Sequence, residues 1–235
     1  YMGDVTPATA GSYRWAARVR WDDGAWLHCD RADAGRVGSE DGWSEANAPT
    51  LLVSDVLTVV TLNLRCLLDD YDLRLPLILD ALVASGADLI GFQEVCRYPD
   101  AADNLSDIVS GRTARTGSAY SVVRTVTHLS WDVYDEGIAL ITPHTITGQD
   151  EVTLPTGSFQ RKVVMARVLT PLGSVVMGTT HLDHLDSPTR LAQINAALTG
   201  LTGFNNWGDP TLLTGDFNEC PDGDIHAAIL HASLA

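Results

Sequence analysis

Apolar runs that end in polar residues are the feature that most constrains how this chain folds. The segment LTVVTLNLR (57–65) is apolar and β-branched, and ADLIGFQEV (87–95) is a second such run that follows Gly86. Between them, residues 71–85 carry apolar side chains at helical spacing. A strand, a helix and a strand in this order predict a β-α-β unit with parallel strands.

The same alternation of strand and helix patterns continues toward the C-terminus and predicts a mixed α/β (α+β) domain over residues 55–235. A helix is predicted at 187–201, and strands are predicted at 119–126, 136–142, 161–170, 173–180 and 211–215. Segments 97–118 and 143–160 are interpreted as loops that shape the mouth of a crevice and select the substrate.

Residues 1–54 have a different pattern and predict a small β region ahead of the main domain. Residues 12–29 alternate apolar and polar side chains around the turn sequence Asp22-Asp23-Gly24, which predicts a β-hairpin. A loop over 30–49 and a strand from Leu51 follow. Two interpretations stay open: the end of a β-sandwich, or an N-terminal extension packed on the main domain.

Composition limits the kinds of partner. The 235 residues carry a formal charge of −15, which disfavours tight binding of polyanions such as duplex DNA. Chemistry on phosphate would therefore need a bound cation. No apolar run of transmembrane length occurs, and residues 1–30 lack the order of a signal peptide.

Polar side chains follow four of the predicted strands directly. They are Asn63, Gln93-Glu94, His181 with Asp183, and Asp216 with Asn218. Because ligands bind outside strand ends in sheets of this kind, we expect these four ends to converge on one crevice. Oxygen ligands from Asn63, Glu94, Asp216 and Asn218 suit Mg²⁺ first and Mn²⁺ second, with Ca²⁺ also compatible, and argue against zinc.

The ordered segments TLNLR, LIGFQEV, EGIAL, GTTHLDH and LTGDFN over residues 57–220 resemble the endonuclease/exonuclease/phosphatase superfamily, which has the deoxyribonuclease-I-like fold. The resemblance implies a four-layer α/β/β/α sandwich and metal-dependent hydrolysis of a phosphoester by direct attack of water. The implied substrates are nucleic acid, a phospholipid head group or a small phosphoester.

The resemblance also assigns roles to individual residues. It implies that Asn63, Glu94 and Asp216 form the metal site and that His181 donates to a phosphoryl oxygen in the transition state. Asp216 would also orient or deprotonate the attacking water, and Asn218 would hold the phosphate or the metal. The catalytic set is then His181, Asp216 and Asn218.

Several other side chains allow a structural or a functional interpretation. Arg190 is interpreted as structural, with phosphate contact as the alternative, and Arg161 has the same two alternatives. A hydrogen bond that anchors a loop is favoured for Glu136, and structural roles are favoured for Asp183 and His184.

Four cysteines lack the spacing of a zinc knuckle. Cys66 and Cys96 follow Asn63 and Glu94 closely, and two alternatives stay open: a disulfide that joins two active-site loops, or two buried thiols. A disulfide would indicate export, and an extracellular or periplasmic location is favoured. No role as a nucleophile is indicated for Cys220.

The sequence departs from the family pattern after Asn218. Family members continue to an Asp-His pair, whereas His226 and His231 lie in a segment of helical pattern and do not form that pair. We therefore expect an incomplete domain from a longer enzyme, and a rate lowered by about 10²- to 10⁴-fold in this chain alone. The alternative is a binding or adhesion module that keeps the fold without the reaction. The oligomeric state is not predicted.

Overall fold

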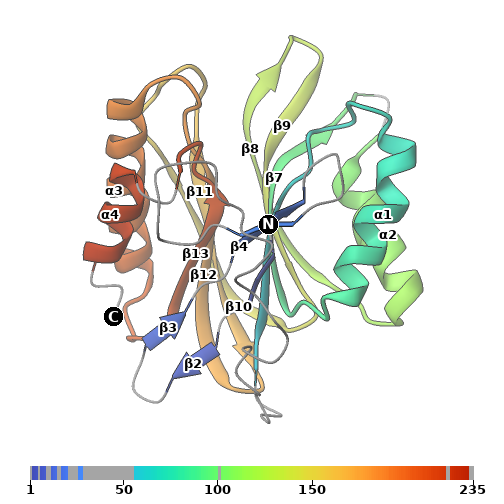
Figure 1. Ribbon diagram of the computed structural model, residues 1–235, viewed down its shortest axis with the longest axis horizontal. Helices are drawn as coiled ribbons and strands as arrows, with labels where there is room; N and C mark the ends of the chain where they lie inside the picture. The colour runs from blue at the N-terminus through green and yellow to red at the C-terminus, as the bar shows by residue number, and fades with distance from the viewer. Residues whose placement is uncertain are drawn as a thin grey trace.

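The computed structural model describes residues 56–99, 102–220 and 223–232, together with the backbone of five short strands between residues 2 and 28. Over this part of the chain, two β-sheets lie face to face and helices cover the outer side of each (Figure 1). The helices α1 and α2 lie on one side and α3 and α4 on the other. The predicted four-layer α/β/β/α sandwich is confirmed.

The first sheet has the strand order β5-β4-β1-β6-β7-β9-β8. Its strands are β1 (Met2–Asp4), β4 (Ala17–Arg20), β5 (Trp26–His28), β6 (Thr58–Asn63), β7 (Leu89–Arg97), β8 (Ser121–Ser130) and β9 (Tyr134–Thr142). Strands β6 and β7 are parallel and are joined through α1 (Tyr71–Ala84), which confirms the β-α-β unit.

The N-terminal strands continue this sheet, because β1 pairs antiparallel with both β6 and β4. Strands β4 and β5 pair antiparallel on either side of the predicted hairpin turn. Strands β2 (Thr6–Ala8) and β3 (Ser12–Arg14) form a separate two-stranded sheet. The predicted loop at 30–49 and the strand from Leu51 lie outside the described residues, and the division at residue 54 stays a prediction.

The second sheet has the order β10-β11-β12-β13. Its strands are β10 (Thr145–Thr153), β11 (Lys162–Thr170), β12 (Gly173–His181) and β13 (Thr211–Asp216). Strands β12 and β13 are parallel and are joined through α3 (Ser187–Phe204), and α4 (Asp224–His231) follows. None of the described helices is both long and apolar enough to cross a membrane.

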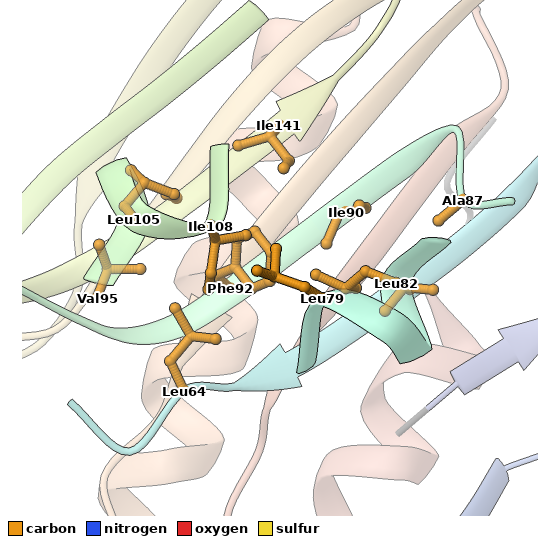
Figure 2. Close-up of a cluster of buried hydrophobic side chains, with 12 residues drawn as sticks. Leu64, Leu79, Leu82, Ala87, Ile90, Phe92, Val95, Leu105, Ile108 and Ile141 are labelled. Atoms are coloured by element: carbon orange, nitrogen blue, oxygen red, sulfur yellow. The ribbon is translucent and has the colours of Figure 1, made fainter. Parts of the chain in front are cut away.

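Among the described residues, three large apolar clusters hold the layers together. Val164, Met177 and Leu140 belong to the cluster between the two sheets. A second cluster packs α1 and α2 against the first sheet around Phe92 (Figure 2), and a third packs α3 and α4 against the second sheet around Leu201. Each sheet is therefore buried on both faces, which agrees with the continuous apolar runs in the sequence.

Close approach of the two sheets requires a glycine at position 91 in β7. A Cβ atom placed there would collide with the side chains of Thr179 and Thr214 on the opposite sheet. Two residues further along β7, Nε2 of the buried Gln93 donates a 2.9 Å hydrogen bond to Oγ1 of Thr179. The contact between the sheets therefore changes from apolar to polar toward the ends of their strands.

Two loop predictions were wrong. Segment 97–118 contains the helix α2 (Asn104–Thr116), and segment 143–160 contains the edge strand β10. Helix α2 is polar overall and buries only one narrow stripe, and most side chains of β10 face water. Neither element therefore carries the strong apolar periodicity by which the others were identified.

Candidate active site

The four polar strand ends meet at one edge of the sandwich. Nδ2 of Asn63, at the end of β6, donates hydrogen bonds to Oε1 of Glu94 at 2.8 Å and to Oδ2 of Asp216 at 3.0 Å. Glu94 lies on β7 of the same sheet, whereas Asp216 ends β13 of the other sheet. One amide group therefore joins two carboxylates that come from different sheets.

Glu94 has an unusual backbone conformation. It is the extra residue of a bulge in the pairing of β7 with β9, and its φ is +50°, in the left-handed region. Burial raises the pKa of its carboxyl group above the ordinary value, and the nearby charges of Glu136 and Asp216 raise it further. A desolvated carboxylate beside like charges is stabilised by a bound cation.

His181 and Asp216 are register partners in the parallel pair of β12 and β13. Nε2 of His181 lies 3.9 Å from Oδ2 of Asp216, which is too long for a hydrogen bond. Burial, with a further contribution from the positive charge of Arg161, lowers the pKa of His181 to about 3. The imidazole is therefore neutral near pH 7.

Asn218 forms a tight turn immediately after β13. Its φ is +51°, its backbone N–H donates to Oδ1 of Asp216 at 3.0 Å, and its Nδ2 donates to the carbonyl oxygen of Leu182 at 3.0 Å. The turn therefore orients the carboxylate of Asp216 and ties the end of β13 to the end of β12. Left-handed conformations at both Glu94 and Asn218 are typical of functional sites.

These side chains open onto a cleft of about 610 Å³. Glu94, His181, Asp216 and Asn218 all line it, so the structure brings the predicted catalytic residues and two of the predicted metal ligands to one cavity. Asn63 lies behind the two carboxylates and holds them together.

The two arginines differ in position. Arg161 is buried and lines the cleft; its guanidinium group lies 3.9 Å from Glu136, and its Nε has no hydrogen-bond partner among the described residues. Arg190 does not line the cleft. It donates to the carbonyl oxygen of Asp183 at 3.3 Å and lies 3.7 Å from Glu219. Of the arginines and the lysine in the described part of the chain, Arg161 is therefore the one available to an anion in the cleft.

Asp183 anchors a loop from a buried position. Burial alone would raise the pKa of its carboxyl group, but hydrogen bonds from the backbone N–H groups of Asp186, Ser158 and Leu185 lower it well below the ordinary value. The bond from Ser158 connects the loop after β12 to the segment before β11, and the other two hold the loop itself.

The alternatives for the cysteines are also resolved. Cys66 and Cys96 form a disulfide bond, and Cys220 is free and exposed. Beside the disulfide, Glu136 accepts a short hydrogen bond from the hydroxyl group of Ser130, which links β9 to the end of β8.

The comparisons with known proteins agree with this architecture. The model of the endonuclease/exonuclease/phosphatase family matches residues 60–234, which is most of the chain. This chain belongs to the endonuclease/exonuclease/phosphatase family. A comparison with curated protein sequences gives no significant match.

Solved structures of this family have the same fold. A family protein from Leptotrichia buccalis is 18% identical, with a TM-score of 0.64 over 76% of this chain and 74% of that chain. The human nocturnin catalytic domain is 21% identical, with a TM-score of 0.57 over 69% and 63%. A mannosyl-6-phosphatase from Bacteroides thetaiotaomicron is 17% identical, with a TM-score of 0.60 over 74% and 70%. At these low identities, the similarity to the solved structures shows a shared fold.

The residues present fit the divalent cation on which enzymes of this family generally depend. Glu94 and Asp216 offer carboxylate oxygens at one point of the cleft, and both accept from the same amide nitrogen of Asn63. Oxygen donors of this kind suit Mg²⁺ or Mn²⁺. In this arrangement Asn63 turns its NH₂ group toward the carboxylates, while its oxygen accepts from the backbone N–H of Arg65. Direct ligation by Asn63 stays a prediction.

One wall of the cleft was missed by the sequence analysis. It consists of His128 and Trp131 from the hairpin of β8 and β9, and of Phe159 from the segment before β11. The rings of His128 and Phe159 stack with centroids 4.5 Å apart. Continuing the strand alternation past residue 126 would have included His128, but no local signal indicates Phe159.

Proposed function

We propose that this chain is a divalent-metal-dependent phosphoesterase that cleaves its substrate by direct attack of water. The observation that carries the proposal is the convergence of Glu94 and Asp216 on the amide group of Asn63, beside the buried His181. Four strands from two sheets supply these groups, and membership of a family of phosphoester hydrolases supports the same reaction.

Glu94 and Asp216 would hold the cation, with Mg²⁺ as first choice and Mn²⁺ as second. A bound cation supplies positive charge that offsets the phosphate and polarises a phosphoryl oxygen.

The other side chains act on the phosphoryl group and on water. Neutral His181 donates a hydrogen bond from its ring N–H to a phosphoryl oxygen, where negative charge increases in the transition state. The guanidinium group of Arg161 binds the same anionic group from the buried side of the cleft. Asp216 accepts a hydrogen bond from the attacking water, and the turn at Asn218 holds this carboxylate in place.

The proposed substrate is a phosphoester of nucleic acid, of a phospholipid head group or of a small molecule. The structural neighbours include a mannosyl-6-phosphatase and a protein complexed with a single-strand DNA product. Because the chain carries a charge of −15, duplex DNA is the least favoured of these substrates.

We also propose an extracellular or periplasmic location, because a buried disulfide next to the active site persists in an oxidising compartment. Alkylation of the protein under denaturing conditions, directly after its source cells are lysed, followed by mass measurement, tests this. Unmodified Cys66 and Cys96 would support the location, and alkylation of both would overturn it.

Hydrolysis of bis(4-nitrophenyl) phosphate and 4-nitrophenyl phosphate tests the reaction. We expect hydrolysis of at least one compound with Mg²⁺ or Mn²⁺ and none with a chelator. Glu94→Gln should lower the rate by about 10²-fold or more, whereas Glu151→Gln, which changes a carboxylate on the edge strand β10, should not. Equal rates with and without the cation would overturn the proposal. Cation binding without hydrolysis would favour the binding-module alternative.

A further inference from the structure

We propose that Asn104 and the Cys66–Cys96 disulfide are positioning groups that hold Glu94 in the backbone conformation required to bind the cation. The inference rests on the metal site of the proposed function and extends it to residues outside the cleft. Neither group lines the cleft, so neither is a catalytic residue.

The conformation of Glu94 needs support from its surroundings. A left-handed φ of +50° is unfavourable for a residue with a Cβ atom, and the bulge removes Glu94 from the regular pairing of β7 with β9. Such a conformation persists only where neighbouring contacts fix it. The direction of the Glu94 carboxylate therefore depends on what holds its peptide groups.

Asn104 holds both sides of the bulge with one side chain. Its Nδ2 donates to the carbonyl oxygen of Glu94 at 3.1 Å, and its Oδ1 accepts from the backbone N–H of Cys96 at 3.0 Å. The residue is completely buried. These two hydrogen bonds span the turn at Glu94 and leave its peptide groups little freedom to rotate.

Capping of α2 does not explain this side chain. Asp103 is the N-cap residue and accepts from the backbone N–H groups of Leu105 and Ser106. Among the described residues, the side chain of Asn104, the first residue of the helix, instead bonds only to the β7 backbone. Helix α2 thus presents a buried amide to the bulge, and the apolar packing of Leu105 and Ile108 keeps it there.

The disulfide fixes the other side of the same turn. The backbone N–H of Cys66 donates to the carbonyl oxygen of Glu94 at 3.2 Å, so this oxygen accepts from both Cys66 and Asn104. The side chain of Cys66 is bonded to Cys96, two residues after Glu94. The disulfide therefore joins the loop that follows Asn63 to the strand that carries Glu94.

Mn²⁺ titration followed by electron paramagnetic resonance tests Asn104. We expect Asn104→Ala to weaken Mn²⁺ binding by about 10-fold or more, as loss of groups that orient metal ligands typically does. Asn205→Ala is the matched control. Asn205 is also buried and holds a loop through its amide, with Nδ2 donating to Asp209 O at 2.6 Å and Oδ1 accepting from Asp209 N at 3.0 Å, but it lies at the end of α3.

The control separates positioning from general destabilisation. Urea unfolding should show a loss of stability for both alanine variants, whereas Mn²⁺ affinity should fall only for Asn104→Ala. Equal Mn²⁺ affinity in Asn104→Ala and wild type would overturn the role of Asn104.

A second experiment tests the disulfide and does not depend on whether Asn104→Ala folds. Reduction of wild type with a phosphine reductant should weaken Mn²⁺ binding, and the double variant Cys66→Ser/Cys96→Ser should bind weakly with or without reductant. Unchanged affinity in both cases would overturn the role of the disulfide. If wild type itself binds no Mn²⁺, the metal site of the proposed function fails, and the positioning role fails with it.

Discussion

Nδ2 of Asn63 donates a 3.0 Å hydrogen bond to Oδ2 of Asp216, although 153 residues separate the two in the sequence. The bond crosses from one sheet of the sandwich to the other. It exists because parallel pairing within each sheet brings two strand ends to the same edge, with Asn63 opposite Gln93 and His181 opposite Asp216. The candidate active site therefore depends on the packing of the two sheets rather than on any one segment.

His181→Gln separates chemistry from metal binding. Because His181 is a neutral donor that holds no cation in this account, we expect the rate to fall by about 10²- to 10³-fold while Mn²⁺ affinity stays at the wild-type value. Steady-state kinetics and an Mn²⁺ titration measure the two quantities. His231→Gln, on the exposed end of α4, is the control. A large fall in Mn²⁺ affinity for His181→Gln would contradict the assigned role.

His128 makes folding stability depend on pH. Burial, followed by the charge of Arg161, lowers the pKa of this imidazole from 6.5 to about 4. Between these pH values the unfolded chain binds a proton at His128 and the folded chain does not, so the free energy of unfolding falls as pH decreases through that window. Urea unfolding of wild type and His128→Gln between pH 8 and 4 tests this.

The variant should lose less stability than wild type on going from pH 7 to pH 4.5. Above pH 7 the two proteins should differ by a constant amount. If the free energy of unfolding changed with pH by the same amount in wild type and His128→Gln over the whole range, a lowered pKa at His128 would be contradicted.

Gly91→Ala should destabilise the sandwich, because the new methyl group would collide with Thr179 and Thr214 of the opposite sheet. We expect a loss of about 1–3 kcal/mol, as for other overpacked cores. Gly203→Ala is the control, since a Cβ atom at that position in α3 meets no atom within 4 Å and alanine favours the helix. Urea unfolding measures both, and equal stability of the two variants would show that the sheets tolerate the methyl group.

Much of the architecture was predictable from local pattern. Strands with continuous apolar runs were located within a few residues, as the predicted 173–180 and the observed β12 (Gly173–His181) show. Helix α2 was missed, although Asp103 is a good N-cap and buried Leu105, Ile108 and Arg112 follow at helical spacing. Its stripe is interrupted by polar residues, so the apolar signal is weak.

The site was predictable only in part. Polar residues directly after strands, together with the resemblance to a known family, pointed to Asn63, Glu94, His181, Asp216 and Asn218 as candidate site residues, and the structure places them together. The aromatic wall with Phe159 and the support of Glu94 by Asn104 depend on tertiary packing, for which the sequence has no local signal. The same holds for the choice between Arg161 and Arg190, because both are arginines in plausible positions and only the packed structure shows which lines the cleft.

The central claim is that Glu94 and Asp216 bind one divalent cation, and an Mn²⁺ titration of wild type, Glu94→Gln, Asp216→Asn and Asp150→Asn tests it most directly. Asp150, an exposed residue on β10, provides the matched control for Asp216. The account predicts saturable binding by wild type and Asp150→Asn, and loss of that binding in Glu94→Gln and in Asp216→Asn. Equal binding by all four proteins, or no binding by wild type, would contradict it.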